Sequence, residues 1–245
     1  MSFTTLPPEL HLQIASYLPT PSLSHLLQTN RRYRNLLLPL LHTHALLPLP
    51  TCTSLHNAIA TPHPALFALL LDHLSHPLNP LNTAGHTPLH TALAHRRKHF
   101  FHSLLRAGAD PHIPTPYGDT PLHMAVLHDD LEAVEALIAA GVDVNATNFV
   151  GQSAVFGAVQ GASDGRVLEA LLGAGADLRI RDWVGVRVLE DAVRAGDGAG
   201  WVLERLAREV VRRGWAGGGS VEEVVEEARR EMEALDVGFG EGLVW

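Results

Sequence analysis

Two segments of the sequence share one pattern, Gly85-His86-Thr87-Pro88-Leu89-His90-Thr91-Ala92 and Gly118-Asp119-Thr120-Pro121-Leu122-His123-Met124-Ala125. The second begins 33 residues after the first, at Gly118 instead of Gly85. Each is followed by an apolar stretch and then by a glycine, Gly108 or Gly141. A fixed period of this size is typical of stacked repeats, in which each unit buries its apolar face against its neighbours.

The repeated residue types suit the start of a helix. Thr87 and Thr120 can accept hydrogen bonds from free backbone N–H groups. Pro88 and Pro121 then occupy the first helical position, where no donor is lost. The leucine and the alanine of each copy lie one turn apart on the same face. The glycine that closes each unit suits the left-handed residue after a second helix.

This pattern resembles the ankyrin repeat. The resemblance implies that His90 and His123 are structural residues, which bond to the backbone and to the capping threonine. It predicts an array over residues 51–213, with structural positions Thr87, Pro88, His90, Thr120, Pro121 and His123. The expected repeats are 51–84, 85–117, 118–150, 151–184 and 185–213.

The outer repeats depart from the pattern. The first opens at Thr53, and the first repeat of such an array is often irregular because one of its faces has no neighbouring repeat. In the fourth, Ala154 and Phe156 replace the proline and the histidine, so we expect a different capping network. In the fifth, Arg187 and Glu190 replace the threonine and the histidine, as in a degenerate terminal repeat.

The N-terminal segment forms a separate unit. The spacing of its apolar residues predicts three short helices between Leu6 and His44. Three helices of this length bury little core by themselves, so we expect them to lean on a neighbour or a partner.

The same segment, residues 1–48, resembles an F-box. The resemblance rests on Leu6-Pro7-Pro8-Glu9-Leu10, Tyr17-Leu18-Pro19 and Asn30-Arg31-Arg32-Tyr33, where Tyr33 replaces the usual tryptophan. It implies binding of a Skp-type adaptor through Leu6, Pro7, Leu10, Ile14, Leu18 and Leu23. The alternative is that these helices merely cap the repeat array.

The C-terminal segment, residues 214–245, begins with a glycine-rich hinge at Gly214 to Gly219. Ser220 and Glu223 form a capping box that predicts the start of a helix. One face of that helix carries Val221, Val224, Val225, Ala228, Met232 and Leu235, and an apolar tail follows. We interpret the helix as a cover for the last repeat, although its apolar face could equally hold a partner.

Composition narrows the functional classes. The single cysteine, Cys52, excludes a disulfide framework and favours a reducing compartment, the cytoplasm or the nucleus. The sequence shows neither a secretory signal nor a membrane span, so no membrane partner is expected. Residues 1–109 carry a net charge of +5 and the remainder −13, and the basic residues are too sparse to predict nucleic-acid binding.

No motif predicts catalysis. His95, His99 and His102 have the spacing of one helical face, but no carboxylate or cysteine lies near them in sequence to complete a zinc site. His95 also falls at an expected loop position of the repeat. The recognisable nucleotide, zinc and nucleophile motifs are absent from the sequence. We therefore predict no enzyme, no metal and no cofactor.

Binding is the more promising function. In ankyrin repeats, partners lie along the fingers between repeats and the exposed ends of the first helices. The fingers here carry Pro116-Tyr117, Phe149-Val150 and Trp183-Val184, which predicts three large side chains at equivalent positions. Such a row suits interface anchors, or else each ring packs on the next finger for stability. The variable helix-start positions Asn57, Thr91, Met124, Gly157 and Asp191 would add specificity.

The combined prediction is an all-α protein: a three-helix F-box, a solenoid of about five ankyrin repeats and a C-terminal helix. The resemblance to fungal-like F-box proteins with ankyrin repeats implies a non-catalytic substrate receptor of a cullin-based, SCF-type ubiquitin ligase. The F-box would bind the Skp-type adaptor, and the repeats would bind an unknown substrate protein through Tyr117, Met124, Phe149 and Trp183. The alternative is an ankyrin scaffold unrelated to ubiquitination.

Overall fold

The computed structural model describes residues 53–60, 62, 64, 67, 68, 71, 78–161, 165–195 and 200–240. The expected F-box helices lie outside the described residues, as do Leu6, Pro7, Leu10, Ile14, Leu18 and Leu23. Within the described part every regular element is an α-helix, and only isolated bridges occur besides, at Thr147–Ser153 and Arg181–Arg187. The all-α prediction is therefore confirmed.

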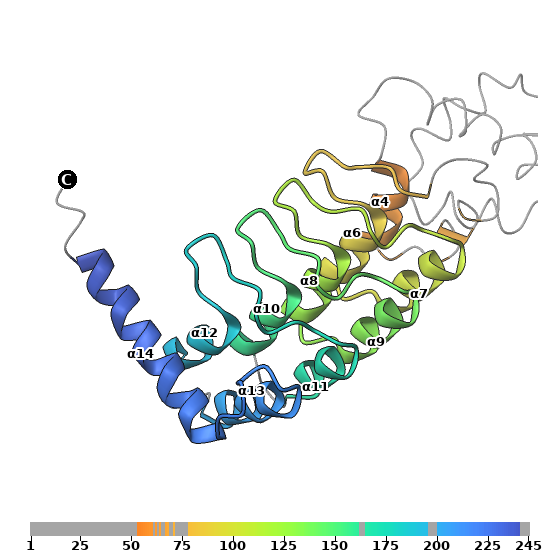
Figure 1. Ribbon diagram of the computed structural model, residues 1–245. Helices are drawn as coiled ribbons and strands as arrows, with labels where there is room; N and C mark the ends of the chain where they lie inside the picture. Colours follow the sequence, from red (N-terminus) through yellow and green to blue (C-terminus); the bar gives the residue numbers. More distant parts are fainter. Residues whose placement is uncertain are drawn as a thin grey trace, which may run out of the picture.

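The helices form two layers along an extended array (Figure 1). The first layer contains α4 (Thr53–Ala60), α6 (Pro88–Ala94), α8 (Pro121–Leu127), α10 (Ala154–Gln160) and α12 (Val188–Arg194). The second contains α7 (Lys98–Arg106), α9 (Leu131–Ala139), α11 (Arg166–Gly173) and α13 (Gly200–Arg212). The last helix, α14 (Val221–Gly240), packs against α12 and α13 at the C-terminal end.

The core is a repeated set of leucines and their neighbours. Second-layer helices bury a leucine at the same position in each repeat, at Leu104, Leu137, Leu171 and Leu206. First-layer helices bury the residue that follows the proline position, at Leu89, Leu122, Val155 and Leu189. Because these side chains pack on the helices before and after them, each repeat depends on its neighbours for burial.

Each Thr-Pro-Leu-His segment closes on itself through the histidine. The Thr87 hydroxyl lies 2.8 Å from His90 Nδ1, and the Thr87 N–H donates to the same nitrogen at 3.3 Å. Thr120 and His123 repeat this arrangement at 2.9 and 3.2 Å. Since Nδ1 accepts a hydrogen bond from a backbone N–H, each imidazole is neutral and carries its proton on Nε2.

That Nε2 proton links one repeat to the next. It faces the carbonyl oxygen of the residue just before the capping position of the following repeat. The three links are His56 to His86 O at 3.0 Å, His90 to Asp119 O at 3.2 Å and His123 to Gln152 O at 3.1 Å. The histidine ladder, as we call these three links, joins the first four repeats.

The ladder ends where the fourth repeat departs from the pattern. Phe156 is buried at the histidine position but cannot donate, and the buried Ser153 hydroxyl has no partner among the described residues. A different bond joins this repeat to the fifth, from Gln160 Nε2 to Asp191 Oδ2 at 2.9 Å. The prediction of a different capping network is confirmed.

The fifth repeat replaces the Thr–His pair with charges. The Arg187 N–H donates to Glu190 Oε2 at 2.6 Å, and Arg187 Nε donates to Glu190 Oε1 at 2.7 Å. The same guanidinium reaches Glu231 of α14 at 2.7 Å. Because the Glu190 carboxylate is fully buried, this pairing offsets a large desolvation penalty. The start of α12 is thereby tied to the C-terminal helix.

The C-terminal helix covers the last repeat, as expected. Ser220 and Glu223 form the predicted capping box, with bonds of 2.9 and 3.2 Å. Val224, Ala228 and Met232 are buried on the side that faces the array. Leu235 and the apolar tail lie outside the part whose side chains the structure describes.

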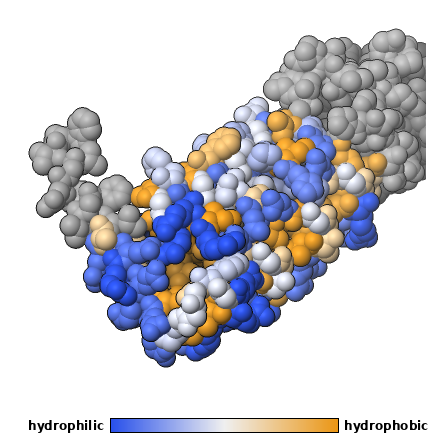
Figure 2. Space-filling view, viewed as in Figure 1, coloured by the Kyte–Doolittle hydropathy of each residue, from blue (hydrophilic) through white to orange (hydrophobic). Residues whose placement is uncertain are grey.

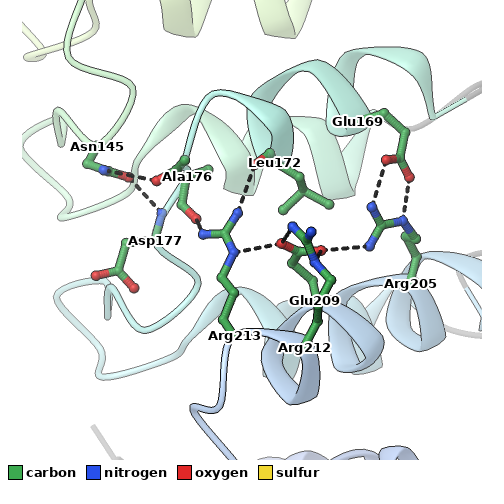
Figure 3. A network of polar contacts seen from close by, with 10 residues as sticks. Asn145, Glu169, Leu172, Ala176, Asp177, Arg205, Glu209, Arg212 and Arg213 are labelled. Carbon is green, nitrogen blue, oxygen red and sulfur yellow. Dashed lines mark hydrogen bonds and ion pairs between the residues drawn. The ribbon is translucent and has the colours of Figure 1, made fainter.

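A buried carboxylate organises the second layer near this end (Figure 3). Glu209 of α13 is 1% exposed and bonds to Arg205, Arg212 and Arg213. Arg213 also donates to the carbonyl of Leu172, in the last turn of α11, and to that of Ala176, after the helix, at 2.7 Å each. Hydrogen bonds from Arg212, and then from Arg213 and Arg205, outweigh burial and lower the pKa of Glu209 to about 2. The carboxylate thus remains charged and holds α13 on α11.

Our first prediction tests the repeat register. Leu122 is 1% exposed in α8, whereas Leu127 is 70% exposed on the same helix. Leu122→Ala should lower the free energy of unfolding by about 2–5 kcal/mol, because it leaves a cavity between repeats. Leu127→Ala is the matched control and should change little. Equal unfolding midpoints for the two variants in a urea titration would contradict this register.

The second prediction concerns acid stability. Burial lowers the pKa of His90 from 6.5 to about 4. Between these values the unfolded chain binds a proton that folded His90 excludes, so the free energy of unfolding should fall as the pH is lowered from 6.5 towards 4. His90→Phe, which copies the fourth repeat, should reduce this slope, whereas His112→Phe at an exposed site should preserve it. Urea titrations across this range, with identical slopes in all three proteins, would refute the role of His90.

Candidate functional site

A series of loops projects from one edge of the array, and each leads into a first-layer helix (Figure 1). We call these loops fingers; in the described residues they span 78–86, 110–119, 143–152 and 177–186. Each finger turns at a glycine with positive φ, at Gly85, Gly118, Gly151 and Gly185. The fingers are equivalent in conformation, so their tips present one position of the repeat after another.

A short polar side chain shapes each finger. The residue three positions before the turn glycine accepts hydrogen bonds from backbone N–H groups two and four residues further on. These residues are Asn82, Thr115, Asn148 and Asp182. They were not among the predicted site residues, although an Asn, Thr or Asp three residues before each glycine was the available signal.

Neighbouring fingers approach one another closely at these glycines. A Cβ atom added to Gly118 would lie 2.7 Å from Phe149 N, and one added to Gly151 would lie 3.0 Å from Trp183 N. At Gly85 the added atom would overlap the ring of Pro116. Glycine is therefore required twice over, for its positive φ and for the space that the next finger occupies.

Hydrogen bonds join the finger tips directly. Phe149 N–H donates to Tyr117 O at 3.0 Å, and Trp183 N–H donates to Val150 O at 2.9 Å. This bonding places Phe149 and Trp183 at the same position of the repeat, two residues before the glycine. The equivalent residue in the preceding finger is Pro116, so Tyr117 is offset by one residue from the position predicted for it.

The large side chains at the tips are exposed. Tyr117, Phe149 and Trp183 are 73%, 77% and 78% exposed. Among the residues that the structure describes, no ring–ring contact joins these three to one another. We call this surface the fingertip row and define it as Pro116, Tyr117, Phe149, Val150, Trp183 and Val184. Exposed apolar side chains gathered in this way are typical of an interaction surface.

The expected specificity positions on the first-layer helices divide into two groups. Met124 and Gly157 are half-buried and Asn57 is exposed. Thr91 and Asp191 are buried, and their side chains bond to Thr87 O and to the Gln160 side chain. They are therefore not accessible to a partner, contrary to the prediction. The exposed Leu127, three residues after Met124 on α8, was missed; its spacing on the helix was the available signal.

The three histidines considered for zinc do not form a site. His95 lies in the turn after α6, as its repeat position predicted, whereas His99 and His102 lie in α7. His102 bonds to Glu132 at 3.0 Å. Within the part of the chain that the structure describes, no group of three metal-ligating side chains comes together.

A charged pocket lies beside these histidines, at the turns between the two layers. Lys98 pairs with Asp130 and Glu132 at 3.1 Å each. The two turn residues Arg96 and Asp129 adopt positive φ, at 52° and 53°. The pocket has a volume of about 380 Å³ and is lined by both signs of charge. The ion pairs of Lys98 link the start of α7 to the start of α9, which favours a structural role.

The surface is unevenly hydrophilic. In Figure 2 strongly hydrophilic surface gathers at the C-terminal end, over α13 and α14, and apolar surface is more frequent towards the middle of the array. None of the helices in the described ranges is long and apolar enough to cross a membrane.

Comparison with protein-family models gives two matches. Residues 3–47 match the F-box-like model, and residues 94–182 match the model for ankyrin repeats in three copies. A comparison with curated proteins found no match. Helix α4 precedes the ankyrin match and helices α12 to α14 follow it, so our outer repeat boundaries remain predictions.

Both families are non-catalytic interaction modules: F-box domains generally bind Skp-type adaptors, and ankyrin repeats bind proteins. Their combination makes this chain a protein-interaction adaptor. The F-box-like match covers the residues that carried the F-box resemblance, and the ankyrin match covers Gly118 to Ala125, the second copy of the repeated pattern. The two-layered helical array agrees with the ankyrin resemblance. The chain is therefore an F-box protein with ankyrin repeats.

Proposed function

We propose that this protein is a substrate receptor of an SCF-type cullin ubiquitin ligase. The F-box-like segment binds the Skp-type adaptor, and the repeat array binds the protein to be ubiquitinated. The observation that carries the proposal is the exposed fingertip row on an array that follows an F-box-like segment. Catalysis belongs to other subunits of the ligase.

The array has the rigidity that a receptor requires. The histidine ladder joins the first four repeats, and the charged groups of α12, α13 and α14 close the C-terminal end. A surface held in one shape before binding loses less conformational entropy when a partner arrives. The second, third and fourth fingers share this order, because backbone hydrogen bonds join their tips.

The proposed contacts of the receptor are separate along the chain. Leu6, Pro7, Leu10, Ile14, Leu18 and Leu23 are proposed to meet the adaptor, and Tyr117, Met124, Phe149 and Trp183 the substrate. Because the two sets lie in different modules, substitutions in one set should leave the function of the other intact. This separation allows each half of the proposal to be tested alone.

The third prediction tests the adaptor. Pro7→Ala combined with Ile14→Glu should abolish binding of the Skp-type adaptor, because a carboxylate buried in that contact without a partner costs several kcal/mol. Binding is measured by co-purification of full-length protein with adaptor and cullin. The circular dichroism of the variant should match that of the wild type. A wild-type chain that fails to bind the adaptor would refute the ubiquitin-ligase role and leave an ankyrin scaffold.

The fourth prediction tests the substrate surface. Phe149→Ser together with Trp183→Ser should reduce the proteins captured and ubiquitinated in cells, while adaptor binding and the unfolding midpoint stay unchanged, because both rings are exposed. Trp201→Ser is the matched control, since Trp201 is exposed on α13 in the other layer. A large loss of stability in the double variant would instead identify the rings as packing elements.

A further inference from the structure

We propose that the fingertip row binds an amphipathic helix of the partner protein, through an uncharged apolar stripe on that helix. The inference rests on the proposed function in taking the row as the substrate contact, and it goes further by naming the kind of segment that fits. Three features of the row carry it: the use of its backbone donors, its charge and the spacing of its rings.

Every backbone N–H group at the tips already has an acceptor within the protein. Pro116 has none to offer. The N–H groups of the turn glycines donate to carbonyls of their own finger, at 2.9 Å in each case, at Gly118, Gly151 and Gly185. The residues just before them donate to the short polar side chains that shape each finger, from Tyr117, Val150 and Val184. Phe149 and Trp183 donate to the preceding tip.

This use of donors disfavours an extended partner. A strand that adds to an exposed edge gains affinity from main-chain hydrogen bonds. Here its carbonyl groups would lie against the row without a donor, and a polar group buried without a partner is costly. A helix satisfies its backbone groups internally, so it can lay an apolar face on the row at no such cost.

The charge of the row selects an uncharged face on that helix. The tip residues themselves are uncharged, and the nearby charged groups are already engaged. The Asp119 carboxylate accepts from Asn148, the Asp182 carboxylate accepts from two backbone N–H groups, and Arg181 donates to Gly185 O. A charged side chain of the partner placed on the rings would lose its hydration and find no opposite charge among the tip residues themselves. Apolar side chains complement this surface.

The spacing of the rings matches a helix as well. Neighbouring helices in a layer pack about 8–10 Å apart, so rings on successive fingers are separated by about that distance. A helix rises about 1.5 Å per residue, and seven residues span about 10.5 Å. A partner helix with an apolar residue at every seventh position therefore places one such residue at each finger, and a second apolar residue three or four positions later widens the same face. Three fingers require a helix of about 14 residues or more.

The test uses two displayed peptide libraries against the full-length protein. Both contain peptides of about 21 residues with the same composition. The first has its apolar residues at the first and fourth positions of each heptad and a proline at its N-terminus, where a helix tolerates one. The second has the same residues, with the apolar ones at alternate positions of a central segment and the proline in the middle of that segment. The heptad library should be enriched at least about tenfold over the other. Its selected peptides, made synthetically, should gain helical circular dichroism on binding.

Two variants show where the selected peptides bind. Phe149→Ser with Trp183→Ser should weaken their affinity about tenfold or more, and Trp201→Ser should leave it unchanged. Because the contact is uncharged, affinity should vary little between about 50 mM and about 500 mM salt. Enrichment of the alternating library, or heptad peptides that bind the double variant equally well, would overturn the inference.

The inference and the proposed function can fail separately. If the chain does not bind the Skp-type adaptor but heptad peptides bind the row, the ligase role falls and the helix-binding surface stands. If the adaptor binds and the ring substitutions reduce ubiquitination, while the alternating library is the one enriched, the receptor role stands and the partner's segment is extended. The second result would refute the inference made here.

Discussion

The structure depends on one hydrogen bond that is repeated along the array, from a buried neutral histidine to a carbonyl of the next repeat. Its geometry requires two partners at once. Thr87 must bond to Nδ1 of His90 so that Nε2 carries the proton, and the next repeat must place Asp119 O within reach. The same bond therefore sets the start of one helix and the position of the following finger. Burial is the main cause that lowers the pKa of His90 and so disfavours the charged form, and the hydrogen bond to Asp119 O opposes it only in part.

At the C-terminal end, ion pairs take the place of the histidine bonds that join neighbouring repeats. Past Phe156 the ladder cannot continue, and the array ends on Arg187, Glu190 and Glu231. Glu209 adds a second charged centre on α13, whose carboxylate remains ionised down to a pH of about 2. The two ends should respond differently to acid: the histidine-linked repeats lose stability below pH 6.5, whereas this charged centre keeps its ion pairs at that pH.

The proposed binding surface follows from how completely the backbone N–H groups of the fingers are hydrogen-bonded within the protein. Glycines let neighbouring fingers lie against one another. Short polar side chains accept hydrogen bonds from the tip N–H groups that do not bond to the neighbouring finger. What remains exposed is a set of large apolar side chains on a rigid backbone. Such a surface has no free backbone donors for a partner strand, but its exposed apolar side chains can pack against the apolar face of a helix. Order in the fingers and the proposed selectivity for a helix thus have the same physical origin.

Sequence alone determined the period, the helix starts, the all-α class and both family resemblances, because these depend on residue types at fixed local spacing. Thr87 and His90 lie three residues apart, so their pairing could be predicted from the chain. The adaptor residues from Leu6 to Leu23 remain predictions. Tertiary structure alone decided which side chains face solvent: Thr91 and Asp191 are buried, and Leu127 is exposed. It also brought Glu231 to Arg187 across 44 residues and joined the tip of each finger from the third on to the tip before it, through Phe149 N–H to Tyr117 O and Trp183 N–H to Val150 O. Burial and register between repeats depend on contacts between distant segments, which local spacing does not encode.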